Sequence, residues 1–278
     1  MNLCALCVSV VNGFMADTTT MTVPAFRAAK AAGKKLAVVT AYDYTAAVIA
    51  EAAGADAVLV GDSLGMVMQG QKHPLPVSLA QMAYHTQCVA RGITKALIIA
   101  DMPFGSYQAS PRQAVRSAVK LLKAGAHAVK LEGGRRMVPA LRALADADIP
   151  VMGHIGLTPQ SVHALGGFKV QRDAEAVLDD AAAVSAAGTF AMVVECVPMS
   201  IAERVTFMTS VPTIGIGAGP SCDGQVLVWH DLLGLYDGMR PKFVKRYAEL
   251  GAVATDAVRA YCQEVRAGTF PGPGHGFT

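Results

Sequence analysis

The sequence has few charged residues and no long apolar run. Charged residues make up 16% of the 278 residues, whereas apolar residues make up 53%. No uninterrupted apolar stretch reaches the roughly 18 residues that a membrane-spanning helix requires. No block of Lys or Arg is present either, which argues against a nucleic-acid partner. We therefore expect no membrane and no nucleic acid among the partners, a large core, and a surface suited to oligomerisation.

Cysteine is scarce and scattered, with six in the whole chain. Cys4 and Cys7 have the spacing of half a zinc site, but no second pair and no nearby histidine accompanies them. This pattern favours reduced thiols in the cytoplasm. The apolar patch near the start follows no basic segment, since the first basic residue is Arg27, so a signal peptide is not indicated. We expect residues 1–20 to be a disordered extension and residues 21–278 to form one catalytic domain.

Short apolar runs alternate with helix-like segments at spacings of roughly 30 to 40 residues. Seven runs are strong strand candidates, from residues 36–40 to residues 212–217, and residues 243–247 are a weaker eighth candidate. The alternation predicts an α/β fold with parallel strands, and the length suits one (β/α)₈ TIM barrel of about 250 residues. A helix over residues 24–32 would close its bottom. A doubly wound open sheet is the main alternative, but residues 40–43 form no glycine-rich nucleotide turn.

Five of the predicted strands end at an ionisable residue. These residues are Asp62, Asp101, Glu132, His154 and Glu195. In a parallel barrel, the carboxyl ends of all strands share one rim. Three of the acids come from consecutive strands, and acids that converge in a partly dry site repel one another unless a cation such as Mg²⁺ binds between them. The sequence therefore predicts a metal site, although each acid could instead cap the following helix or bind backbone amides.

The residues around these acids suggest chemistry on a 2-oxo acid. Lys130 lies two residues before Glu132, so both point to one face of their strand, and the lysine could bind a substrate carboxylate. A bound Mg²⁺ keeps open positions for the oxo acid and can stabilise its enolate. Glu195 is the candidate base for the carbon-bound proton. His154 could be a ligand, an acid or an orienting group, and the sequence does not rank these roles.

Nine motifs together resemble the ketopantoate hydroxymethyltransferase family, over roughly residue 21 to the end of the chain. They are TAYD at 40–43, VGDSLGM at 60–66, AYHT at 83–86, ADMPF at 100–104, VKLEGG at 129–134, GHIGLTPQS at 153–161, ECVP at 195–198, IGIGAG at 214–219 and PKFVK at 241–245. As a set they are far more specific than any one motif. The N-terminal extension is the part that the resemblance does not reach.

The resemblance implies a Mg²⁺-dependent transfer of a hydroxymethyl group from 5,10-methylenetetrahydrofolate to 3-methyl-2-oxobutanoate. The product would be 2-dehydropantoate, an intermediate of pantothenate synthesis. Position by position, it implies metal residues Asp62, Asp101 and Glu132, substrate contacts Asp62, Ser63, Asp101 and Lys130, and Glu195 as the proton acceptor. We add His154 as a further substrate-binding candidate. The resemblance also implies a (β/α)₈ barrel and a homodecamer built from two pentamers.

Two other functions stay open at this point. A metal-dependent lyase of the phosphoenolpyruvate and isocitrate-lyase type would use a similar enolate on a related barrel, but the lysine- and cysteine-rich loop motif that is common in those lyases is absent. A non-catalytic barrel that binds an oxo acid would have no need of five ionisable groups at five strand ends.

Overall fold

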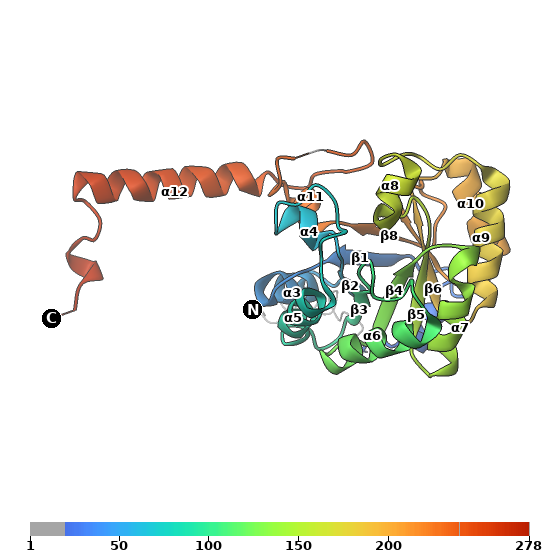
Figure 1. Cartoon of the computed structure of the whole chain (residues 1–278). Coiled ribbons are helices and arrows are strands. Elements are labelled where there is room, and N and C mark those ends of the chain that lie inside the picture. Colours follow the sequence, from blue (N-terminus) through green and yellow to red (C-terminus); the bar gives the residue numbers. More distant parts are fainter. Residues whose placement is uncertain (1–19, 239, 278) are drawn as a thin grey trace, which may run out of the picture.

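The structure is a computed structural model that describes residues 20–238 and 240–277. All but one residue of the expected N-terminal extension, including Cys4 and Cys7, lies outside the described residues. In the described part of the chain, eight parallel strands close a barrel in sequential order (Figure 1). The strands are β1 (Leu36–Thr40), β2 (Ala57–Val60), β3 (Leu97–Asp101), β4 (Ala128–Glu132), β5 (Val151–Gly156), β6 (Ala191–Glu195), β7 (Thr213–Ile216) and β8 (Gly224–Leu227). The closed barrel confirms the predicted fold over the open sheet.

The prediction for the eighth strand was wrong. β8 follows β7 after the short connection 217–223, and it pairs with β7 on one side and β1 on the other. Residues 243–247 lie in a later loop, where Phe243 reaches the cavity at the barrel mouth. The strand escaped prediction because it has only four residues, starts with glycine, and has no helix before it.

Asp223 joins two segments that are far apart in the chain. Its carboxylate accepts hydrogen bonds from the Thr213 backbone N–H at 2.9 Å and pairs with the Lys30 ammonium at 2.8 Å. It thereby joins the start of β7 to the N-terminal segment of the chain.

Among the described residues, nine helices follow the strands or lie in their loops. They are α3 (Tyr44–Ala52), α4 (Leu64–Val67), α5 (Leu79–Ala90), α6 (Pro111–Lys123), α7 (Val138–Asp146), α8 (Val162–Leu165), α9 (Ala174–Ala186), α10 (Met199–Met208) and α11 (Trp229–Leu233). Four of them begin at a side-chain cap, in which Asp43, Ser78, Ser110 or Asp173 accepts a backbone N–H three residues later. None of the described helices combines the length and the apolar character needed to cross a membrane.

A short helix, α2 (Val23–Ala28), closes the amino-terminal end of the barrel, as predicted, although it ends before residue 32. Thr22 caps it, and Phe26 is fully buried among the first residues of the strands. The Phe26 ring meets Phe190 edge to face, with centroids 5.7 Å apart. Burial of one such ring stabilises a fold by roughly 1.5–3 kcal/mol. Helix α2 therefore helps to close the barrel interior at its amino-terminal end.

Alternation in β4 separates the two layers of the core. Val129 and Leu131 point outward and pack in the apolar layer between the strands and the helices. Ala128 points inward at the bottom of the barrel, and Lys130 and Glu132 point into the cavity above it. This arrangement is the one that the alternation of the sequence predicts.

The last long helix, α12 (Leu250–Ala267), does not join this ring. It extends away from the barrel (Figure 1), and none of its residues is buried. The barrel wall at β1 and β8 is correspondingly open: outward-facing Ala37 and Gln225 are exposed, whereas every residue of β3 and β4 is buried. The wall at β1 and β8 is therefore left uncovered by residues 20–238 and 240–277.

Candidate active site

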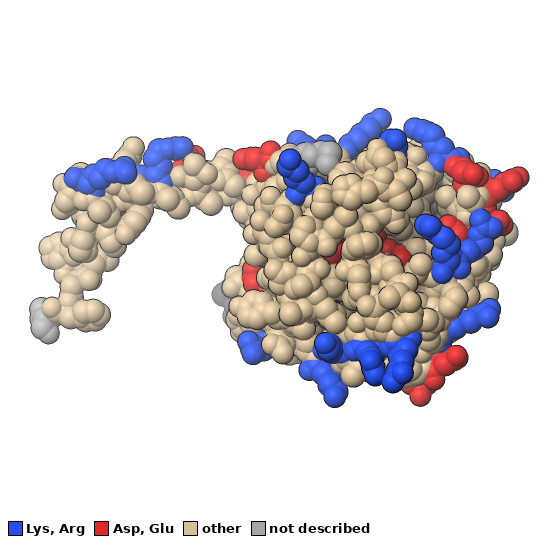
Figure 2. Space-filling model, viewed as in Figure 1, with Lys and Arg blue, Asp and Glu red and all other residues tan. Residues whose placement is uncertain are grey.

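A cavity of about 370 Å³ opens at the carboxyl ends of the strands. Figure 2 shows a hollow near the centre of this face, with acidic atoms inside it. All seven predicted site residues line the cavity: Asp62, Ser63, Asp101, Lys130, Glu132, His154 and Glu195. The structure therefore brings together every candidate that the sequence analysis selected.

The three neighbouring acids are almost completely buried, with Asp62 4%, Asp101 2% and Glu132 4% exposed. Asp101 uses one oxygen to accept the backbone N–H of Asp62 at 3.1 Å. Its other oxygen lies 2.6 Å from the Lys130 ammonium, which is also 3.5 Å from Glu132 Oε1. One buried lysine thus faces two of the three acids.

Burial and mutual repulsion set the protonation of these acids. Burial raises the pKa of Asp62 well above its usual range, and the charges of Asp101 and Glu132 add to this effect. Burial also raises the pKa of Asp101, although Lys130 opposes it. For Glu132, burial alone would raise the pKa, but Lys130 and His154 outweigh it and lower that pKa to about 2. The protein's own groups therefore favour a proton on Asp62, whereas Glu132 stays ionised beside Lys130 and His154.

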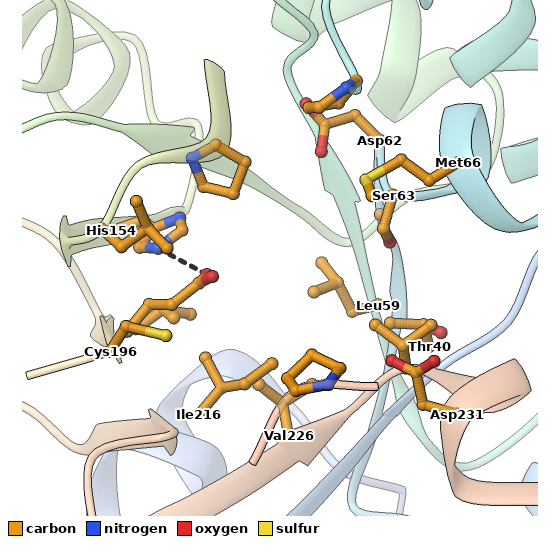
Figure 3. A pocket seen from close by; sticks show the side chains of 18 of the residues that line it. Thr40, Leu59, Asp62, Ser63, Met66, His154, Cys196, Ile216, Val226 and Asp231 are labelled. Atoms are coloured by element: carbon orange, nitrogen blue, oxygen red, sulfur yellow. Dashed lines mark ion pairs between the residues drawn. The ribbon is translucent and has the colours of Figure 1, made fainter. Parts of the chain in front are cut away.

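His154 connects this cluster to the base candidate across the rim. The strand register places it beside Glu132. Its Nδ1 lies 3.2 Å from Lys130 Nζ and 3.4 Å from Glu132 Oε1, and its Nε2 lies 3.2 Å from Glu195 Oε2 (Figure 3, dashed line). Burial and Lys130 would lower the pKa of His154, but the two glutamates raise it to about 9. A cationic imidazole can therefore hold the Glu195 carboxylate in place.

Ser63 ends a short chain of hydroxyl groups. The Trp229 backbone N–H donates to Thr40 Oγ1 at 2.9 Å, and Thr40 donates to the Tyr42 hydroxyl at 2.8 Å. The Tyr42 and Ser63 hydroxyls are 2.9 Å apart. Either of these two hydroxyls can donate to the other, and the bond between them holds Ser63 at the edge of the cavity (Figure 3). Tyr42 was not among the predicted site residues.

The opposite side of the cavity is apolar. Leu59, Ile216 and Val226 lie together below Met66 in Figure 3. Cys196 adjoins them, but burial and the charge of Glu195 raise the pKa of its thiol to about 12. The thiol therefore stays protonated at neutral pH and is a poor nucleophile. The cavity thus offers charged groups on one side and an apolar surface on the other.

The sequence model of one protein family, described as ketopantoate hydroxymethyltransferase, matches residues 20–273. The chain belongs to this family.

Curated relatives of this family resemble the chain along nearly its whole length. A 3-methyl-2-oxobutanoate hydroxymethyltransferase from Moorella thermoacetica is 53% identical over 268 residues, which cover 95% of this chain and 100% of the relative. One from Ralstonia nicotianae is 54% identical over 262 residues, covering 93% of this chain and 95% of the relative. The resemblance that the motifs predicted is thereby confirmed.

Solved structures of other families share the fold. A phosphonopyruvate hydrolase complex with oxalate and Mg²⁺ has a TM-score of 0.63 at 15% identity and covers 90% of this chain and 89% of its own. A 2,3-dimethylmalate lyase of the PEP mutase/isocitrate lyase superfamily has a TM-score of 0.60 at 17% identity, with 94% and 93% covered. At these identities the likeness concerns the barrel alone.

The chemistry of the three acids suits a cation. Within residues 20–238 and 240–277, no three His, Cys, Asp or Glu side chains stand as a ready metal-binding group. The donor set is nevertheless appropriate, because three carboxylates with hard oxygen atoms line one cavity and a cation could replace the proton that Asp62 favours. A divalent cation would relieve the repulsion that raises the pKa of Asp62.

Proposed function

We propose that this chain transfers a hydroxymethyl group from 5,10-methylenetetrahydrofolate to 3-methyl-2-oxobutanoate, which yields 2-dehydropantoate for pantothenate synthesis. The observation that supports this most is the combination of family membership over residues 20–273 with a buried acid cluster facing an apolar surface in one cavity. The reaction joins C3 of the oxo acid to the one-carbon unit in an aldol-type addition, and it needs a base for the proton on C3.

Asp62, Asp101 and Glu132 are the residues that would hold Mg²⁺ or another divalent cation. Their burial and the hard oxygen donors that they bring to one cavity support this assignment. When bound, the cation would supply Lewis-acid stabilisation of the negative charge that develops on the keto oxygen.

The other residues act on the oxo acid directly. Lys130 and Ser63 are placed to hold its carboxylate end, the first by charge and the second through its hydroxyl, which Tyr42 holds at 2.9 Å. Leu59, Ile216 and Val226 suit its branched apolar end. Glu195 takes the proton from C3, and His154 fixes the carboxylate of Glu195 at 3.2 Å. Water releases the one-carbon unit of the folate as formaldehyde, with both C–N bonds broken and tetrahydrofolate as the other product. The carbon nucleophile then adds to the formaldehyde carbon, and the resulting alkoxide takes up a proton to become the hydroxymethyl group.

Solvent exchange at C3 tests this assignment. Proton NMR of 3-methyl-2-oxobutanoate in D₂O should show loss of the C3 proton signal when the protein and Mg²⁺ are present, and no loss with EDTA. Addition of methylenetetrahydrofolate should then yield 2-dehydropantoate. Cleavage of a carbon–carbon bond in a substrate would instead indicate a lyase, and tight binding of the oxo acid with neither exchange nor product would indicate a non-catalytic barrel.

The proposal includes a cytoplasmic homodecamer of two pentamers, which the family resemblance suggests. The described cysteines, Cys88, Cys196, Cys222 and Cys262, are all free, which supports a reducing compartment. Self-association is supported by the exposed helix α12, on which Leu250, Val258, Tyr261 and Val265 follow one another at the spacing of a single helix face. We propose that α12 of a second copy covers the open barrel wall at β8 and β1.

The assembly can be tested on α12 itself. A double variant, Val258→Asp with Tyr261→Asp, places two charges on the apolar face, where the side chains are 61% and 54% exposed in the single chain. We expect sedimentation to show smaller species than the wild type. Gln263→Asp adds a charge to the opposite face of the same helix and should leave the assembly intact. An unchanged mass for the double variant would contradict the role of α12.

A further inference from the structure

Gln160 is a buried amide directly beside the acid cluster, and neither the sequence analysis nor the proposed function gives it a role. It lies in the 3₁₀ turn Pro159–Ser161, which follows β5, and it is 5% exposed. A buried amide has two donor and two acceptor positions to satisfy. The hydrogen-bond partners of the Gln160 amide therefore show which groups it positions.

The side-chain nitrogen of Gln160 contacts the acid of β2. Nε2 donates to Asp62 Oδ2 at 2.8 Å and to the Met102 carbonyl at 2.9 Å. On the other side of the amide, Oε1 accepts from the Tyr107 hydroxyl at 2.7 Å and from Gln108 Nε2 at 3.2 Å. Because a flipped amide would set an oxygen against Asp62 and a nitrogen against a donor, these partners fix one orientation.

The backbone of the same residue contacts the acid of β4. The Gln160 N–H donates to Glu132 Oε2 at 3.0 Å. One residue therefore restrains one oxygen of Asp62 and one oxygen of Glu132, and leaves the second oxygen of each carboxylate for other partners. For Glu132, that second oxygen faces Lys130 and His154.

We propose that Gln160 is a positioning residue that holds the Asp62 carboxylate correctly turned for the divalent cation. The inference rests on the proposed function, because it concerns the same acids. Its physical basis is geometric: the Nε2 hydrogen bond to Asp62 Oδ2 and the backbone hydrogen bond to Glu132 Oε2 restrict the rotation of both carboxylates. Groups that orient metal ligands from behind in this way typically contribute about 10–100-fold to metal affinity.

Tyr107 forms a second layer behind Gln160. Its hydroxyl lies 2.7 Å from Gln160 Oε1 and 3.1 Å from the Glu132 carbonyl, and its side chain is 2% exposed. Removal of this hydroxyl would free the amide to rotate while keeping the residue that contacts Asp62. Tyr107→Phe should therefore weaken Mg²⁺ binding, by a smaller factor than a substitution of Gln160.

The experiment is titration of the purified full-length protein with Mg²⁺ alone, followed by calorimetry, so that the readout does not depend on turnover. We expect Gln160→Leu to weaken Mg²⁺ binding by about 10–100-fold and Tyr107→Phe to weaken it by a smaller factor. Gln263→Leu is the matched control, because it is the same chemical change at an exposed position on α12, far from the acids in the chain. It should bind Mg²⁺ as the wild type does.

Asp62→Ala separates failure of this inference from failure of the proposed function. If the wild type itself does not bind Mg²⁺, the proposed metal site is wrong. If the wild type binds and Asp62→Ala does not, but Gln160→Leu binds as tightly as the wild type, the metal site stands and the role of Gln160 is refuted. Should Gln160→Leu fail to fold by circular dichroism, Tyr107→Phe decides, and undiminished affinity in that variant overturns the proposal.

Discussion

Glu195→Gln is expected to slow solvent exchange at C3 of 3-methyl-2-oxobutanoate by about 10²–10⁴-fold, which is the usual contribution of a general base. Glutamine has almost the same shape as glutamate and can still contact His154, but it cannot accept a proton. Glu195 ends β6, lines the cavity, and keeps its side chain 15% exposed, so a proton can leave toward solvent. The measurement is the NMR exchange rate with Mg²⁺ present and folate absent.

The matched control for this variant is Glu203→Gln, the same chemical change at an exposed position on α10. It should leave the exchange rate unchanged. Mg²⁺ binding by Glu195→Gln should also equal that of the wild type, because Glu195 contacts His154 and not the three acids. Exchange at the wild-type rate in Glu195→Gln would show that another group removes the proton, and His154 would then be the nearest candidate.

Most of the barrel could be predicted because each strand carries a local signal. In β4, for example, apolar residues alternate with Lys130 and Glu132, and the structure sends the two sets to opposite faces. The site residues followed from the same signal, since a polar group at the end of an apolar strand has only the barrel rim to occupy. Strand β8 was not predicted, because its four residues carry almost no sequence pattern of their own. Its pairing with β1 depends on closure of the whole barrel.

Gln160 and Tyr42 could not be selected for a different reason. Both belong to quoted motifs, but a glutamine after a proline and a tyrosine before a helix cap are ordinary loop residues in a sequence. Their importance arises from loops that meet only after folding, since Gln160 contacts groups from β2, the β3 loop and β4. Supporting contacts of this kind join residues that are far apart in the chain, so no local sequence pattern indicates them.

Lys130→Met is expected to destabilise the protein by about 3–5 kcal/mol, the usual effect of removing one partner from a buried ion pair. The Lys130 side chain is 5% exposed and faces Asp101 at 2.6 Å and Glu132 at 3.5 Å. Methionine fills a similar volume without charge, so three buried acids would lose the cation that offsets their repulsion. The urea midpoint at fixed protein concentration, measured with EDTA present, reports the change.

Two comparisons make the Lys130 result specific to the acid cluster. Lys30→Met removes a lysine from the ion pair with Asp223, where both side chains keep more solvent contact at 19% and 16% exposed, and it should cost no more than about 1 kcal/mol from the ion pair. Addition of Mg²⁺ should stabilise Lys130→Met by more than it stabilises the wild type, since the variant leaves more negative charge for the cation to offset. A loss equal to that of Lys30→Met would mean that the acids are neutralised by protonation. Lys130 would then serve to bind substrate and not to hold the cluster together.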